Sequence, residues 1–168
     1  MKKEIAKIFL VVAFLITISA CDRRNCENVV CPVNQGCNNG QCYCGDGYEG
    51  TNCDINSYEK YIVINNYAYE SCNTPPPFTT TNIYITWDGV YINQVHIHNL
   101  MGSNCPDVIA IIRTDANNEG NILEINEQTC GGSSVSGQGT YDKINHRVNL
   151  QLYYNVSGTG YSCNTILQ

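Results

Sequence analysis

The 11 cysteines of this chain constrain its fold more than any other feature, because they fall into three groups. Cys21 stands alone after an apolar stretch, the next six crowd together, and the last four are spread over the remainder of the 168 residues. An even group of six and an even group of four predict two disulfide-bonded modules, which leaves Cys21 for a separate role. The two groups are Cys26, Cys31, Cys37, Cys42, Cys44 and Cys53, and then Cys72, Cys105, Cys130 and Cys163.

The amino terminus has the parts of a secretory signal, with a lysine-rich start, the apolar run IFLVVAFLITI and small residues before Cys21. The run is shorter than the roughly 20 residues of a membrane-spanning helix. The sequence ISAC that ends at Cys21 resembles the lipobox of bacterial lipoproteins. The resemblance implies a signal peptide over 1–20 and a lipidated Cys21 that begins a short tether over 21–25. The alternative is an ordinary secretory signal followed by an incidental cysteine.

Lipidation would determine where the protein works. In bacterial lipoproteins the cysteine thiol receives a diacylglycerol and the new amino terminus is acylated, and several chains together make a stable anchor. Disulfides persist outside the cytoplasm, which agrees with the ten other cysteines. We therefore expect a lipid-anchored protein of the bacterial cell envelope, at the outer membrane, with the membrane as a partner through its N-terminal lipid.

The charge argues against nucleic acid as a partner. The formal net charge is −6, and removing a leader with three lysines and one glutamate takes it to −8. Such a chain has no electrostatic attraction for phosphate backbones or anionic lipid surfaces. Its polar surface must come from Asn, Thr, Ser, Gly and 12 tyrosines, a composition that suits extracellular β structure.

The six grouped cysteines follow the spacing C-x4-C-x5-C-x4-C-x-C-x8-C, with Gly47 and Gly50 in the last interval, where tight turns suit glycine. The segment 26–54 resembles the epidermal growth factor (EGF)-like domain over its whole length. A segment this short needs bridges because it cannot bury enough apolar surface. A metal site is the alternative, but no histidine lies nearby. The resemblance implies the pairs Cys26–Cys37, Cys31–Cys42 and Cys44–Cys53.

Calcium-binding EGF-like domains carry acidic residues just before the first cysteine. Here Arg24 stands where a carboxylate or amide is wanted, and Asn25 replaces the usual Glu or Gln. We therefore interpret the module as the type without calcium, serving as a spacer or an interaction surface.

Residues 58–168 are predicted to form an antiparallel β domain with two disulfides, a barrel or a two-sheet sandwich, so that the whole chain is mainly β. Its β-branched and aromatic residues, frequent turn residues and lack of helical periodicity support this. From Asn126 onward the domain is similar to β-domains of uncharacterised Bacteroidota lipoproteins, which implies no particular activity. The expected strands are 61–69, 83–87, 90–98, 108–113, 121–126, 134–141, 147–155 and 160–167.

Local signals predict the turns of this domain. Asp88-Gly89 predicts a hairpin, and residues 142–146 predict a short loop. A change of apolar parity along 90–98 predicts a bulge or a bend near Asn93. The GGSSVSG segment is interpreted as a flexible turn. Four cysteines allow three connectivities, of which we favour Cys72–Cys105 and Cys130–Cys163, because shorter closures are commoner.

Two groups of side chains have metal-ligand character. His96 and His98 project from one face of an expected strand and could bind zinc if a third ligand came from a neighbouring strand. The simpler interpretation places both on the solvent face, with Val95 and Ile97 towards the core. His146, the third histidine, is expected in a turn.

Residues 115–120 match the first half of a calcium loop through Asp115, Asn117, Glu119 and Gly120. The twelfth position is Asn126 rather than a bidentate glutamate, so a polar hairpin loop explains the same residues. We expect neither a metal nor a cofactor.

The sequence contains no G-x-S-x-G nucleophile motif, no phosphate-binding glycine loop and no HExxH pair. Every cysteine has a structural or lipid role, so we expect binding rather than catalysis. The predicted function is interaction at the cell surface with an envelope protein or a glycan. The alternative is a lipocalin-like carrier of a small apolar ligand, and a hydrolase comes third.

Overall fold

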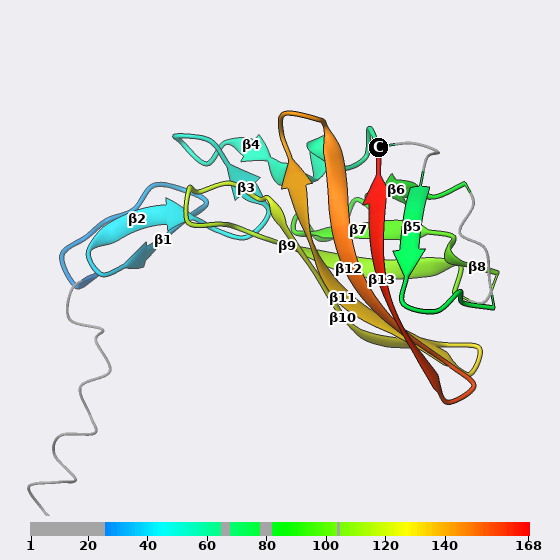
Figure 1. The fold of residues 1–168 in the computed structure, drawn as a ribbon. Helices are drawn as coiled ribbons and strands as arrows, with labels where there is room; N and C mark the ends of the chain where they lie inside the picture. Colours follow the sequence, from blue (N-terminus) through cyan, green and yellow to red (C-terminus); the bar gives the residue numbers. More distant parts are fainter. Residues whose placement is uncertain (1–25, 65–67, 78–81, 104) are drawn as a thin grey trace, which may run out of the picture.

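The computed structural model describes residues 26–64, 68–77, 82–103 and 105–168. Cys21, with the predicted tether and signal peptide, lies outside the described residues. Within these ranges no helix has the length and apolar character needed to cross a membrane. The chain is mainly β, as predicted: a disulfide-rich amino-terminal region precedes one curled antiparallel sheet (Figure 1).

The amino-terminal region consists of two small hairpins, β1 (Gln35–Asn38) with β2 (Gln41–Cys44), and β3 (Tyr48–Glu49) with β4 (Ile55–Asn56). Asn39 and Gly40 join β1 to β2, and both have the positive φ that a two-residue hairpin turn requires. The bridges observed are those that the EGF-like resemblance implied: Cys26–Cys37, Cys31–Cys42 and Cys44–Cys53.

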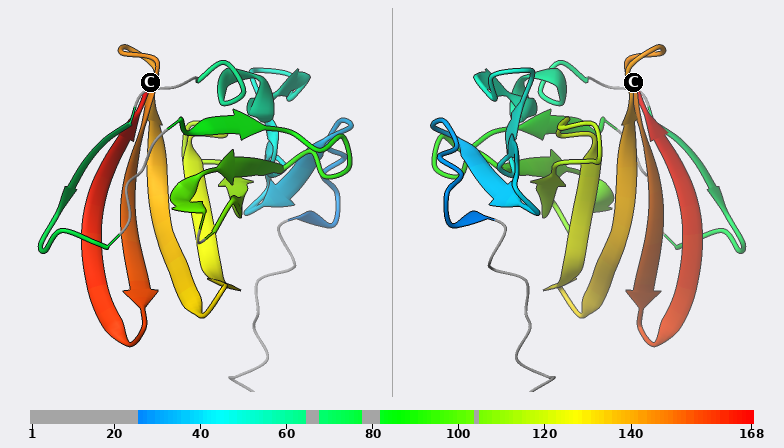
Figure 2. Two further views of the ribbon diagram at one scale, coloured as in Figure 1. Left: turned by 90° about the vertical axis from the view of Figure 1, so that its right-hand side faces the viewer. Right: turned by 90° about the vertical axis from the view of Figure 1, so that its left-hand side faces the viewer.

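A short 3-10 helix, η3 (Ser57–Lys60), leads into an eight-stranded sheet with the order β5-β13-β12-β11-β10-β9-β7-β6. The sheet curls so that β7 and β9 cross behind β10–β13, and the two side views show the same open half-barrel (Figures 1 and 2). One curled sheet thus replaces the two sheets of a sandwich. The strands of the sheet are β5 (Ala68–Cys72), β6 (Tyr84–Thr86), β7 (Gln94–His98), β9 (Asp107–Arg113), β10 (Ile122–Cys130), β11 (Ser133–Asp142), β12 (Arg147–Val156) and β13 (Thr159–Leu167). A further short strand, β8 (Leu100–Ser103), lies outside the sheet.

The hydrophobic core fills the inside of the curl, because alternate residues of each strand point there. On β12 these are Val148, Leu150, Leu152 and Tyr154, all buried, as the alternation in sequence predicts. Tyr61, which follows η3, is also fully buried in this core. The inner face is therefore occupied by the protein's own side chains.

One strand prediction needs correction. The expected strand 61–69 is wrong over residues 61–64, because Tyr61 caps the 3-10 helix η3 and a turn follows it. Residues 65–67 lie outside the described residues, and β5 spans Ala68–Cys72. Of the bulge or bend expected near Asn93, the structure has the bend: the Gln94 N–H donates to the Tyr91 carbonyl at 3.1 Å and closes a turn over 91–94. Residues 90–93 belong to the turn before β7, so their apolar residues need not follow its parity. The register shifts instead between Ile125 and Gln128.

The turn predictions fared unevenly. The loop at 142–146 is confirmed, since β11 ends at Asp142 and β12 begins at Arg147. Asp88-Gly89 does lie between two paired strands, but within a longer loop, because Thr86 pairs with His96. The GGSSVSG segment is mostly strand: only its two glycines form the turn, and β11 begins at Ser133.

The favoured disulfide pairing of the β domain is wrong. The bridges are Cys72–Cys163 and Cys105–Cys130. Cys72 and Cys163 stand directly opposite each other in β5 and β13, although they are 91 residues apart in sequence. Short closure failed as a guide because the first strand of this sheet pairs with the last.

Candidate functional site

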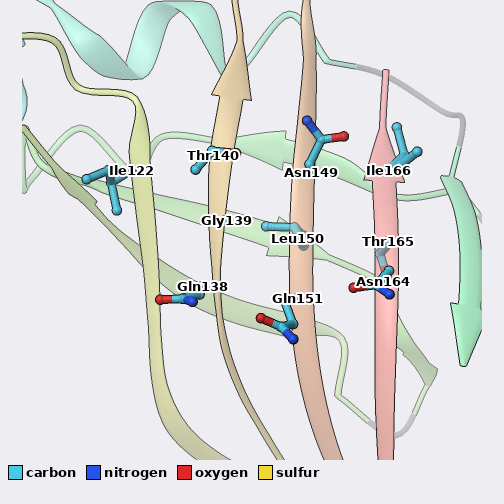
Figure 3. Close-up of a pocket in the computed structure, with 10 residues that line it drawn as sticks. All are labelled: Ile122, Gln138, Gly139, Thr140, Asn149, Leu150, Gln151, Asn164, Thr165 and Ile166. Carbon is cyan, nitrogen blue, oxygen red and sulfur yellow. The ribbon is translucent and has the colours of Figure 1, made fainter. Parts of the chain in front are cut away.

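A hollow of about 580 Å³ lies over β10–β13, on the face of the sheet that points away from the core (Figure 3). Its exposed side chains come from the positions between the core residues, such as Asn149 and Gln151 on either side of Leu150. The buried residues Gly139, Leu150 and Thr165 also contribute to its lining. The lining residues are Ile122, Gln138, Gly139, Thr140, Asn149, Leu150, Gln151, Asn164, Thr165 and Ile166.

Strand register places the carboxamides of this hollow side by side. Gln138, Gln151 and Asn164 face one another in turn across β11, β12 and β13. Directly opposite residues have Cβ atoms about 4.5–5.5 Å apart, within reach of one ligand. We call this surface the amide face and define it as Gln138, Asn149, Gln151 and Asn164.

The amide face offers hydrogen bonds without charge. None of the ten residues that line the hollow is ionisable. Each carboxamide supplies two N–H donors and an acceptor oxygen, so donors and acceptors alternate over a small area.

Two exposed tyrosines stand on the same face of the sheet, at the margins of the amide face. They are Tyr69 and Tyr153, with 58% and 50% of their surfaces exposed. Exposed aromatic rings next to amides suit a neutral ligand that carries both hydroxyl groups and apolar faces.

The two strand histidines lie where their simpler interpretation places them. Val95 and Ile97 are fully buried, so His96 and His98 project from the opposite face of β7. The structure also brings Asp107 of β9 to both of them. His96 Nδ1 lies 2.9 Å from Asp107 Oδ2, and His98 Nδ1 lies 3.9 Å from Asp107 Oδ1. Sequence reasoning missed Asp107, because only the pairing of β7 with β9 sets it opposite His98.

The segment 115–120 forms a polar loop whose carboxylates already have protein partners. Asp115 Oδ1 accepts hydrogen bonds from the backbone N–H groups of Asn117 and Glu119, at 2.8 and 3.1 Å. Its Oδ2 accepts from the Asn121 side chain at 3.0 Å. Burial opposes ionisation, but these hydrogen bonds outweigh it, and the pKa of Asp115 lies below its ordinary value. Glu119 pairs with Lys143. The Asp115 carboxylate thus closes the loop, as the hairpin-loop interpretation expects, and Glu119 attaches the loop to Lys143.

The disulfide-rich region is joined to the β domain through the loop between β9 and β10. Asp46 accepts hydrogen bonds from Arg113 Nη1 at 2.8 Å and from the Thr114 backbone N–H at 3.1 Å. Glu49 accepts from the Gly120 backbone N–H at 3.1 Å. A Cβ at Gly120 would lie 2.1 Å from the hydroxyl oxygen of Ser57, so this contact requires glycine.

Lys60 completes this junction. Its Nζ donates to Glu49 and, at 2.7 Å, to Asn121 Oδ1. Burial lowers the pKa of Lys60, and the hydrogen bond with Glu49 opposes that effect. The segment that sequence reasoning treated as a boundary between modules is therefore a packed contact.

One further group has metal-ligand character by residue type. Glu70 lies beside Cys72 and Cys163, but both sulfurs form a disulfide and have no thiolate to offer. Glu70 instead accepts a hydrogen bond from the Tyr154 hydroxyl at 3.0 Å. Burial, and then the charge of Glu70, raise the pKa of Tyr154.

Comparison with known proteins gave no match to a family model, to a curated protein or to a solved structure.

Proposed function

We propose that this protein is a lipid-anchored binding protein of the bacterial cell envelope, and that its amide face holds a neutral, hydroxyl-rich ligand such as a glycan. The observation that carries the proposal is the uncharged row Gln138, Gln151 and Asn164 across three strands. A polyhydroxylated ligand needs donors and acceptors in alternation, and carboxamides provide both.

The junction supports a role in presentation. Only four residues separate Cys21 from Cys26, so an EGF-like module would sit next to the lipid anchor. The hydrogen bonds of Asp46 and Glu49 attach that module to the β9–β10 loop. In this proposal the module is a short spacer that holds the sheet in a defined orientation near the membrane.

Binding is favoured over the two alternatives. The lining of the amide face has no group that titrates near neutral pH, so it offers no general acid or base for hydrolysis. A lipocalin-like carrier needs an apolar interior space, whereas the inside of this half-barrel is packed with residues such as Tyr61, Leu152 and Tyr154.

Removing two carboxamides is expected to weaken ligand binding about 5- to 150-fold. In the double variant Gln151→Ala/Asn164→Ala, two exposed side chains are lost, and hydrogen bonds contribute about 0.5–1.5 kcal/mol each. Stability should change little, since both positions are on the surface. The ligand is first selected from an array of neutral and acidic glycans, and its dissociation constant is then measured by calorimetry.

Gln41→Ala is the matched control, because Gln41 is an exposed amide in the disulfide-rich region. It should leave the dissociation constant unchanged. Equal binding by the double variant and the native chain, or an equal loss in the control, would show that the amide face is not the binding surface.

Cys21→Ala is expected to abolish lipidation and release the protein from the membrane fraction. The substitution removes the thiol that receives the diacylglycerol in the proposed lipoprotein. Detergent phase partitioning and intact mass report the result, with Asp22→Ala as a variant that should remain lipidated. A Cys21→Ala product that still partitions into detergent as a mature, acylated chain would refute the anchor.

A further inference from the structure

Lys60, Glu49 and Asn121 bring together the groups that an amide-forming reaction requires. They come from three separate segments: Lys60 from η3, Glu49 from β3, and Asn121 from the loop just before β10. Lys60 Nζ donates to Glu49 Oε2 and, at 2.7 Å, to Asn121 Oδ1. An amine, a carboxylate and a carboxamide thus meet at one nitrogen atom, and these groups suffice to transfer the acyl group of the carboxamide to the amine.

The lysine nitrogen lies close to the carbon atom that it would attack. A C=O bond is about 1.23 Å long, so Asn121 Cγ is at most about 3.9 Å from Lys60 Nζ. Reacting atoms in a near-attack geometry are about 3–3.5 Å apart. A small rotation of the Lys60 side chain, from in front of the oxygen towards the carbon, covers the difference.

The surroundings of Lys60 favour the neutral amine. Its side chain is 13% exposed and that of Glu49 is 17% exposed. The rings of Tyr141 and Tyr61 lie near Nζ, with centroids 5.2 and 5.7 Å away, and limit its contact with water. Burial lowers the pKa of Lys60, which brings the nucleophilic form of the amine nearer to neutral pH. Glu49 contacts the same nitrogen and is placed to take its proton.

The carboxamide of Asn121 turns its nitrogen away from Lys60. Nδ2 donates to Asp115 Oδ2 at 3.0 Å and to Glu119 Oε2 at 2.7 Å. The two carboxylates fix the orientation of the carboxamide, because only its nitrogen can donate to them and only its oxygen can accept from lysine. They also stand beside the nitrogen that would leave, where they can bind it as ammonium.

We propose that Lys60 and Asn121 join in an isopeptide bond, with Glu49 as the catalytic acid and base. Glu49 takes a proton from the Lys60 ammonium, and the lone pair of Nζ then attacks Asn121 Cγ. The bond from Cγ to Nδ2 breaks as the new amide bond from Cγ to Nζ forms. Nζ goes from three protons to one, and Glu49 passes the two protons to Nδ2, which departs as ammonium. No atom is oxidised or reduced, and Glu49 ends as the carboxylate with which it began.

The product is a covalent tie between η3 and the end of the β9–β10 loop. It closes a loop whose ends are 61 residues apart in sequence, and reductants do not reverse it. The same loop holds the disulfide-rich region through Asp46 and Glu49, so the bond fixes the junction that orients this region on the sheet. The inference is independent of ligand binding, since none of the reacting residues belongs to the amide face.

The test is tryptic peptide mapping of the native chain after reduction and alkylation. After the predicted leader the chain has two lysines, Lys60 and Lys143. An acylated Lys60 resists trypsin, so we expect residues 25–113 as a single peptide that is joined to residues 114–143. The joined peptide should weigh about 17 Da less than the sum of its two parts, because one ammonia is lost when the amine is acylated.

Three variants should each abolish the joined peptide, while circular dichroism establishes that the fold is kept. Lys60→Arg retains the positive charge but has no nucleophilic amine. Asn121→Ala removes the acyl group. Glu49→Gln retains an acceptor for the Gly120 N–H but cannot take up a proton.

Lys143→Arg is the matched control. Lys143 pairs with Glu119 of the same group, but its side chain is 51% exposed, and the hydrogen bond with Glu119 raises its pKa. The substitution should therefore leave the joined peptide unchanged.

Complete tryptic cleavage after Lys60 in native protein that has been kept folded for days at neutral pH would overturn the proposal. An ammonia loss that persists in Lys60→Arg would also overturn it, since such a loss arises when an asparagine cyclises with its own backbone. A joined peptide that survives Glu49→Gln would overturn the catalytic role of Glu49.

Discussion

Replacing both Cys72 and Cys163 by alanine is expected to lower the free energy of unfolding by about 4.6 kcal/mol, because their bridge spans 91 residues. The bridge limits the unfolded chain, and the entropy that it removes grows with the length of the closed loop. In the folded protein it also ties β5, at the edge of the sheet, to β13. Denaturant unfolding followed by circular dichroism measures the change.

The double variant Cys105→Ala/Cys130→Ala provides the comparison. Its bridge closes 25 residues, which corresponds to about 3.5 kcal/mol in the same chain-entropy treatment. The Cys72–Cys163 variant should therefore be the less stable of the two. The reverse order would mean that contacts around the sulfurs outweigh loop length in this domain.

Tyr61→Ala should lower the free energy of unfolding by about 3–5 kcal/mol, the range for removing a large aromatic side chain from a core. Tyr61 is fully buried, its ring meets that of Tyr141 edge to face, and its hydroxyl donates to the Gly120 carbonyl at 2.7 Å. Burial raises the pKa of Tyr61, so the phenol stays neutral and remains a donor. Thermal and denaturant unfolding both report the change.

Tyr61→Phe separates packing from the hydrogen bond. The ring remains and only the hydroxyl is lost, so the expected cost is about 1 kcal/mol, with some addition for the carbonyl left without this donor. A phenylalanine variant as unstable as the alanine variant would show that the hydroxyl contact with Gly120, rather than the ring, holds η3 against the β9–β10 loop.

Local patterns in the sequence predicted much of the fold. Alternation of apolar residues on β12 identified the buried side chains correctly, because successive strand residues point to opposite faces whatever the partner strand is. The cysteines between 26 and 53 pair as the EGF-like resemblance implied, through bridges that span only 9 to 11 residues. The lipidation of Cys21 remains a prediction.

Contacts between distant parts of the chain were not predictable in this way. The pairing of β5 with β13 set Cys72 opposite Cys163 and overturned the preference for short closures. The junction of Asp46 with Arg113 joins residues 67 apart, in a region that looked like a boundary between modules. Neither contact has a sequence signature, because each depends on which surfaces meet once the sheet has curled.

The two candidate sites show the same division. The sequence by itself determined that His96 and His98 lie on one face of their strand, because they are two residues apart. For the same reason, Asn149 and Gln151 lie on one face of β12, opposite to the face of its buried residues. Only the tertiary structure decided that Asp107 stands between the histidines and that Gln138, Gln151 and Asn164 form one row. The physical reason is that strand order and register are chosen by burial of the whole core, which no single segment specifies.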